Sequence, residues 1–363
     1  MARSRFGTVA VSVPVVVLIG LLGAAVYTQT DGPPVNDLPN PYETVRNWGT
    51  LPDGRTWGST AGIDMDPDGR SVWALDRCGA NTCAGSTLPV VLKFDTSGKL
   101  LKSFGAGMFI FPHGLHVDRD GNVWVTDGRV ATPQELEKFP DAKGKGHTVV
   151  KFSPDGKVLM TLGKPGVAGN PPDHLNEPTD IVTAPNGDVF VGDGHSGQNP
   201  KAPPDTIARI VKFDRNGKFL KTWGKWGAAQ GEFKTPHALV FDSRGRLLVA
   251  DRGNHRIQIF NQEGQFLLEW KQFSRISGLY IRNDMLYAID SESNANNHPG
   301  WRKGVRIGNL KDGKVMFFIP PHMTDTPEGA AGEGIAVDTA GNVFTAENTV
   351  RGLTKYIKRL GTK

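Results

Sequence analysis

The sequence predicts an all-β protein, a single six-bladed β-propeller built from repeats of four short strands. Three observations lead to this fold class. A unit of two apolar strands and a hairpin recurs six times, the last copy lacks its fourth strand, and a matching strand, TVRNWGT, precedes the first copy at 44–50. Because that strand would complete the last blade, one closed propeller is expected over 44–363. The six copies begin at Ala61, His113, Thr179, His237, Ser277 and Glu333.

The composition agrees with this fold class. The 363 residues include 45 Gly and 25 Pro, which suits short strands joined by tight turns. A hydrophobic content of 38% allows a large core and excludes a wholly disordered chain. The net charge is +5, but the lysines and arginines form no block, so no nucleic-acid partner is expected.

The first segment, 1–28, precedes the propeller, and its pattern predicts either a transmembrane helix that anchors the chain or a signal peptide. Arg3 and Arg5 stand before an uncharged apolar run from Phe6 to Tyr27, which is long enough to span a bilayer. The same layout also fits a secretory signal cleaved after Ala25. In both cases the following residues are exported, either anchored with the propeller in the periplasm or extracellular space, or secreted. Membrane contact is expected through this segment only, and 29–43 is expected to be a linker.

Export bears on the cysteines, which are the two at positions 78 and 83. An oxidising compartment permits a disulfide between Cys78 and Cys83, which would close a short local loop. A metal-binding pair is the alternative interpretation, but the chain holds no second Cys pair to complete such a site.

The strands of each repeat define two faces of the propeller. The second strands, such as SVWALD and NVWVTD, each end in an acidic residue, and the hairpins follow as in VVKFSPDGKVLMTLG. The start of a first strand and the end of a second strand share one face, which we call the top face. The long insertions at 128–147, 194–206 and 291–304 all follow second strands. Because length variation on one face of a repeat array marks the binding side, we expect the top face to bind the ligand.

Alternate blades place a metal-binding set at this face. The first residue of the first strand is His113 in blade two, His237 in blade four and Glu333 in blade six. These blades stand about 120° apart in a ring of six, so the three side chains can converge on the axis. Two His and one carboxylate with an open position form a catalytic zinc ligand set, although Fe or Mn would also accept it. The alternative is that these residues bind no metal, because polar side chains, including His, are common at the mouth of a propeller channel.

Further polar residues follow the second strands. Arg77 and Arg252 directly follow strand-end acids, and two arginines beside a metal predict a substrate that carries a carboxylate. Alternatively, they pair with those acids or with loop carbonyls. His195 is the candidate general base or acid. His116 is expected to face a neighbouring blade, and His322 is a candidate substitute ligand.

Three stretches of the chain resemble a known family. FPHGLHVDRDGNVWVTD (111–127), EPTDIVTAPNGDVFVGDG (177–194) and TPHALVFDSRGRLLVADRGNHRIQIF (235–260) resemble NHL repeats and are similar to peptidyl-α-hydroxyglycine α-amidating lyase. In that family, zinc is held by three His, of which His113 and His237 match two. Glu333 stands at the third position, and Gly334 stands where the family has an Asp that helps to hold calcium. The family's structural calcium therefore lacks that ligand here.

The resemblance also implies an activity. Arg77 and Arg252 match the family's two active-site arginines, whereas His195 stands where the family has its proposed base, a Tyr. The implied reaction is metal-dependent cleavage of the C–N bond of an α-hydroxy amide, on a small molecule or peptide with a carboxylate, to an amide and glyoxylate. One alternative is a non-catalytic NHL propeller that binds a ligand or protein partner at its top face. Another is a metal-dependent hydrolase such as a lactonase, against which the two His argue. A monomer is expected.

Overall fold

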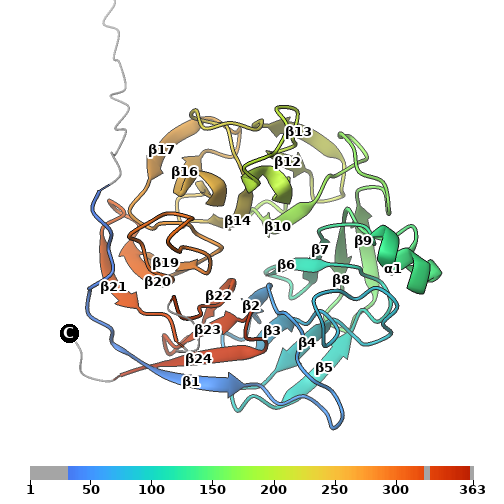
Figure 1. Ribbon diagram of the computed structural model, residues 1–363, viewed down its shortest axis with the longest axis horizontal. Coiled ribbons are helices and arrows are strands. Elements are labelled where there is room, and N and C mark those ends of the chain that lie inside the picture. The colour runs from blue at the N-terminus through green and yellow to red at the C-terminus, as the bar shows by residue number, and fades with distance from the viewer. Residues whose placement is uncertain (1–31, 323–327, 360–363) are drawn as a thin grey trace, which may run out of the picture.

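The computed structural model describes residues 32–322 and 328–359 and shows six four-stranded antiparallel sheets arranged as a ring (Figure 1). In five sheets the strands follow chain order, whereas the sixth has the order β1-β24-β23-β22. The N-terminal strand β1 (Tyr42–Trp48) thus pairs antiparallel with the last strand, β24 (Leu353–Lys358). The predicted six-bladed propeller and its ring closure are confirmed, and the closing strand begins two residues before the expected position 44.

The strands are short, as the turn-rich composition indicates. Blade one contains β2 (Ile63–Met65), β3 (Val72–Leu75), β4 (Val91–Phe94) and β5 (Leu100–Phe104). Blade two contains β6 (Pro112–Val117), β7 (Val123–Asp127), β8 (Thr148–Phe152) and β9 (Val158–Leu162). Blade three contains β10 (Pro178–Thr183), β11 (Val189–Asp193), β12 (Arg209–Phe213) and β13 (Phe219–Trp223). Blade four contains β14 (Pro236–Phe241), β15 (Leu247–Asp251), β16 (Arg256–Phe260) and β17 (Phe266–Trp270). Blade five contains β18 (Gly278–Arg282), β19 (Met285–Asp290), β20 (Gly304–Asn309) and β21 (Val315–Ile319), and blade six adds β22 (Gly334–Val337) and β23 (Val343–Ala346).

The core lies between adjacent blades. Trp73 and Phe104 of blade one and Phe109 and Phe152 of blade two belong to one cluster, and the rings of Phe104 and Phe152 are 5.2 Å apart. The second strand of each blade is almost fully buried because a neighbouring blade covers each of its faces. Such packing fixes the angle between blades, and therefore where each first strand points.

The structured segments outside the strands lie in the insertions and in the chain that precedes β1. The first insertion contains α1 (Pro133–Lys138), which Thr132 and Glu135 cap reciprocally. The Cys78–Cys83 disulfide is present, as predicted. Val35 and Leu38, in the segment expected to be a linker, pack against a core cluster of blades four and five, so part of it lies on the propeller. The predicted segment 1–28 lies outside the described residues, and within these we find no helix long and apolar enough to cross a membrane.

Candidate metal centre

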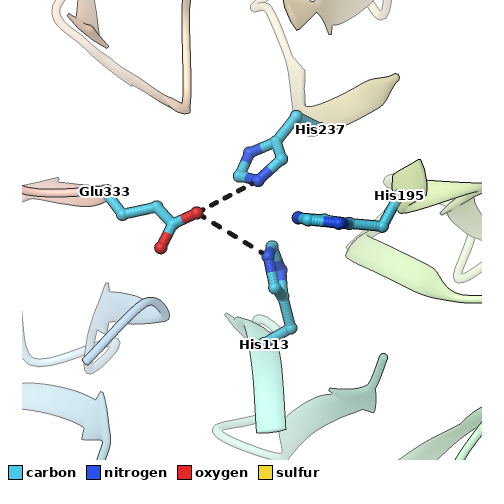
Figure 2. A group of neighbouring side chains, drawn as sticks. All are labelled: His113, His195, His237 and Glu333. Atoms are coloured by element: carbon cyan, nitrogen blue, oxygen red, sulfur yellow. Dashed lines mark ion pairs between the residues drawn. The ribbon is translucent and has the colours of Figure 1, made fainter. Parts of the chain in front are cut away.

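Four side chains meet at the axis of the ring (Figure 2). His113 lies on β6 and His237 on β14, and Glu333 directly precedes β22; each is at most 4% exposed. The fourth is His195, and one ligand atom of each side chain lies within 4.8 Å of the others. The three predicted ligands therefore converge as expected, and the structure adds His195 to the same set of donors.

Small residues next to the donors allow this convergence. A Cβ atom on Gly114 would lie 2.5 Å from the carbonyl oxygen of Thr179, and one on Gly334 would lie 2.1 Å from that of Ala61. Adjacent first strands are therefore too close at the axis for a side chain at these positions. The sequence pattern of a donor followed by glycine in blades two and six reflects this crowding.

A tight turn directs His195 inward. His195 begins the 3₁₀ helix η2 (His195–Gln198), and the preceding residue, Gly194, has φ +117°. A Cβ on Gly194 would lie 2.0 Å from the carbonyl oxygen of Ile207, so glycine is required for this turn. The turn brings the His195 ring to 5.0 Å from that of His113.

The hydrogen bonds of the two ring histidines fix which nitrogen faces the centre. His113 Nδ1 lies 2.8 Å from the carbonyl oxygen of Thr179, and His237 Nδ1 lies 2.6 Å from that of Ser277. A carbonyl only accepts, so both Nδ1 atoms carry the hydrogen and both Nε2 atoms present lone pairs. Neither Nε2 makes a hydrogen bond within the described part of the chain, and the same holds for Glu333 Oε2.

This arrangement fits a bound cation. Glu333 Oε1 lies 3.2 Å from His237 Nε2 and 3.8 Å from His113 Nε2, so lone pairs and a carboxylate face each other in a buried space. These groups repel one another unless a positive charge lies between them. Nitrogen and carboxylate donors that surround one point suit zinc, and the buried, unsatisfied Nε2 atoms are the observation that a metal would explain.

The ionisation states suit metal binding. Burial lowers the pKa of His113 and His195 well below the ordinary value, and it also lowers the pKa of His237. Burial alone would raise the pKa of Glu333, but the neighbouring His237, His113 and Arg252 together hold it well below its usual range. Neutral imidazoles and an ionised carboxylate are the forms that coordinate a metal.

The two predicted arginines flank these donors in different ways. The Arg252 guanidinium donates to Gln198 at 2.9 Å, to Glu333 at 3.3 Å and to His195 Nε2 at 3.2 Å. Arg77 donates to the Pro112 carbonyl and to Asn81, stacks on a Phe ring, and has its buried Nη2 without a partner among the described residues. The two arginines thus border the site as expected, but Arg252 is largely engaged within the protein.

Two cavities reach the donors. One, of about 450 Å³, follows the first strands along the axis and is lined by His113, His237 and Glu333. The other, of about 550 Å³, lies at the top face beside His195 and is lined mainly by polar side chains of the second and third insertions. The expectation that the insertions border a binding site agrees with this second cavity.

Two other histidines lie outside the donor set. His322 Nε2 lies 3.1 Å from a Glu347 oxygen, so the structure gives it a partner other than the metal centre. His116 contacts Thr183 at 2.9 Å and Asp64 at 3.3 Å, and so faces its neighbouring blades as predicted.

The sequence interpretation missed Gln198, Arg275 and Glu292, which surround Arg252. Gln198 and Glu292 lie in the insertions assigned to the binding face, which was the available signal. Arg275 lies three residues before β18, the first strand of blade five, and no feature of the sequence pointed to it.

The chain is similar to NHL-repeat proteins. The NHL repeat model matches residues 233–260. Peptidyl-glycine α-amidating monooxygenase A of Xenopus laevis is 30% identical over 82% of this chain and 32% of that protein. NHL repeat-containing protein 3 of Mus musculus is 30% identical over 75% of this chain and 74% of that protein. Peptidyl-α-hydroxyglycine α-amidating lyase 2 of Drosophila melanogaster is 26% identical over 71% of this chain and 62% of that protein. The chain spans about a third or less of the length of the amidating monooxygenases that it matches.

Proposed function

Because the chain belongs to the NHL-repeat family of β-propellers, whose members include amidating lyases, we propose that it is a metal-dependent carbon–nitrogen lyase. The substrate would be an α-hydroxy amide that carries a carboxylate on the hydroxylated carbon, and the products would be an amide and glyoxylate. The observation that carries this proposal is the buried convergence of lone pairs from His113 and His237 on the Glu333 carboxylate, next to two arginines.

The metal would be held by His113, His237 and Glu333, and zinc is the ion that this donor set favours. When bound, it would act as a Lewis acid that makes the substrate hydroxyl more acidic. Because both Nδ1 atoms donate to backbone carbonyls, the ring histidines are oriented before any ligand arrives. Calcium has no part in this proposal.

The other residues would hold the substrate and move its proton. Arg252, which contacts Glu333 and His195, would bind the substrate carboxylate. Arg77 Nη2, a buried donor without a partner among the described residues, would donate to another oxygen of the substrate. His195 would accept the hydroxyl proton at Nε2, the ring nitrogen that carries the lone pair because Arg252 donates to it in the free protein. Arg252 has to release this atom, for example by turning to the substrate carboxylate, before Nε2 can take the proton. As the hydroxyl becomes a carbonyl, the C–N bond breaks, its electron pair passes to the amide nitrogen, and that nitrogen takes the proton. The atoms of the substrate are then divided between the amide and glyoxylate.

A second candidate is a propeller that binds a ligand or protein at its top face without turnover. The observation that favours it is that Arg252 already donates to Gln198, Glu333 and His195. In that case the departures from the family at Glu333 and His195 would mark a site that has lost catalysis.

The test combines metal content with product release. We expect the purified chain to hold about one zinc and to release glyoxylate from α-hydroxyglycine peptides or related α-hydroxy amides. The His113→Ala/His237→Ala variant should lose both, whereas His174→Ala should lose neither because His174 pairs with Asp173 away from the site. Metal binding without turnover of any α-hydroxy amide would favour the binding propeller. Absence of a transition metal, even after incubation with zinc, would reject the lyase.

The disulfide and the amidating relatives agree with an extracellular or secretory protein. Within this proposal, segment 1–28 anchors the chain to the membrane or is removed as a signal, and the monomeric propeller works outside the cytoplasm.

A further inference from the structure

Two buried guanidiniums converge on one carboxylate at the edge of the top-face cavity. Glu292 Oε2 accepts from Arg275 Nε at 3.1 Å and from Nη2 at 2.8 Å, while Glu292 Oε1 lies 3.4 Å from Arg252 Nη1. The Arg252 and Arg275 side chains are 1% and 8% exposed. Hydrogen bonds from a charged guanidinium to a carboxylate are stronger than those between neutral groups, and here one guanidinium lies against each carboxylate oxygen. These two arginines therefore form a carboxylate-binding seat.

The seat is held by groups other than its occupant. Gln198 Oε1 accepts from Arg252 Nε at 2.9 Å and from Arg275 Nη2 at 2.7 Å. Arg275 Nη1 also donates to the backbone carbonyl of Arg252 at 3.3 Å. Because these bonds do not involve Glu292, the two guanidiniums would remain positioned if the Glu292 carboxylate moved away.

The occupant is the accessible member of the group. The Glu292 side chain is 35% exposed, belongs to the insertion at 291–304, and lines the same cavity as His195 and Lys303. It is the one acidic side chain in the lining of this cavity, as far as the structure describes the chain. A side chain on a top-face loop can turn toward solvent at a smaller cost than either buried arginine.

The seat lies where the substrate carboxylate has to be. Arg252 contacts Glu292 on one side and Glu333 and His195 of the donor set on the other. In an α-hydroxy acid the hydroxyl and the carboxylate are attached to the same carbon. A substrate whose hydroxyl reaches the donors therefore brings its carboxylate within reach of Arg252.

We propose that Glu292 is a specificity-determining residue that occupies the carboxylate seat of Arg252 and Arg275 in the free protein, and that the substrate carboxylate binds by displacing it. The identity of the displacing ligand rests on the proposed lyase function, because that reaction requires a carboxylate beside the hydroxyl. Glu292 then acts as an internal competitor. A neutral ligand cannot replace its charge on the two arginines, so the site selects anionic ligands.

The test measures binding of N-acetylglycine, which has the carboxylate but no hydroxyl to react, and of its neutral amide, N-acetylglycinamide. Calorimetry would compare the wild type, Glu292→Gln, and Glu137→Gln as a control that removes a carboxylate from an exposed site on α1. We expect Glu292→Gln to bind N-acetylglycine about tenfold more tightly, with the neutral amide unaffected and the control like the wild type. Glu292→Asp keeps the charge but is one methylene shorter, so its affinity for N-acetylglycine should lie between those of the wild type and Glu292→Gln.

Unchanged or weaker binding of N-acetylglycine by Glu292→Gln would overturn the inference and assign Glu292 to holding the arginines in place. If Glu292→Gln does not fold, Glu292→Asp decides in the same way. This measurement requires no turnover. Tighter binding in a protein that never releases glyoxylate would keep the carboxylate seat and reject the lyase. If glyoxylate is released but the affinity for N-acetylglycine is the same in the wild type and in Glu292→Gln, the lyase is kept and the role of Glu292 is rejected.

Discussion

Replacing Glu333 with Gln should weaken metal binding without unfolding the propeller. Glu333 supplies the one negative charge among the four converging donors, and its ligand atom lies within 4.8 Å of the other three. At an effective dielectric constant near 20, a carboxylate and a divalent ion about 4 Å apart attract by about 8 kcal/mol. If lost hydration offsets two thirds of this, about 2.7 kcal/mol remains, which corresponds to a metal affinity about 100-fold weaker.

The loss can be measured by thermal unfolding. With free zinc at about 100 times the dissociation constant, the wild type gains about 2.7 kcal/mol, or about 5 °C in melting temperature at roughly 2 °C per kcal/mol. At the same zinc concentration Glu333→Gln should gain about 0.4 kcal/mol, or about 1 °C. Glu292→Gln is the matched control, because it removes a carboxylate that also contacts Arg252 but is not among the converging donors.

Zinc binding by Glu333→Gln with the stoichiometry and affinity of the wild type would refute a role for Glu333 as a ligand. The metal would then be held by the three histidines, and Glu333 would serve only to pair with Arg252. A visible spectrum of the cobalt-substituted protein would separate these cases, since the loss of one donor changes the coordination geometry and hence the absorption bands.

Three further predictions concern the surroundings of the donors. His195→Ala should keep its metal and lower kcat by about 10²- to 10⁴-fold, measured by zinc analysis and glyoxylate release; joint loss of metal and activity would make His195 a ligand instead of the base. Burial raises the pKa of Asp180 to about 7, so the folded state binds the extra proton between about pH 4 and 7 and stability declines as pH rises through 7. Asp180→Asn should remove this dependence, so its stability relative to the wild type should be about 2.7 kcal/mol higher at pH 8.5 than at pH 5 in chemical denaturation. An equal effect at both pH values would contradict the assignment. Cys78→Ser/Cys83→Ser should lower the free energy of unfolding by about 2 kcal/mol, because the disulfide closes a short loop. Since this loop adjoins Arg77, the variant should raise KM more than it lowers kcat. An unchanged KM would show that the loop does not position the Arg77 guanidinium.

The parts of the site that could be predicted from the sequence are those fixed by the repeat. His113, His237 and Glu333 occupy the same repeat position in alternate blades, so their convergence follows once six blades are counted. Ring closure follows for the same reason, since a strand missing at one end of the chain matches a strand at the other.

The parts that could not be predicted depend on irregular segments. Glu292 lies in an insertion whose backbone course the repeat does not set, and Arg275 lies in the connection before blade five. The role of His195 depends on the left-handed conformation of Gly194, which turns the ring toward the axis. The sequence assigned His195 to the top face but not to the donor set, because one residue of turn geometry decides between them.

The alternate blades whose first strands carry no donor side chain nevertheless shape the centre. Blade three supplies the Thr179 carbonyl that fixes the tautomer of His113, and blade five supplies the Ser277 carbonyl that does the same for His237. The orientation of the ring donors is thus a property of the closed ring, since each ring histidine is oriented by the next blade.

In blade one the corresponding carbonyl has a different consequence. The Ala61 oxygen would lie 2.1 Å from a Cβ at position 334, so any side chain there would force blades one and six apart. The amidating-lyase resemblance places a calcium-binding Asp at this position, where this chain has Gly334. Restoring that Asp would therefore displace Glu333, its neighbour, before it could bind calcium. The carboxylate donor Glu333 and the glycine at 334 therefore depend on each other. Blade one approaches so closely that Glu333 can keep its position at the axis only if residue 334 has no side chain.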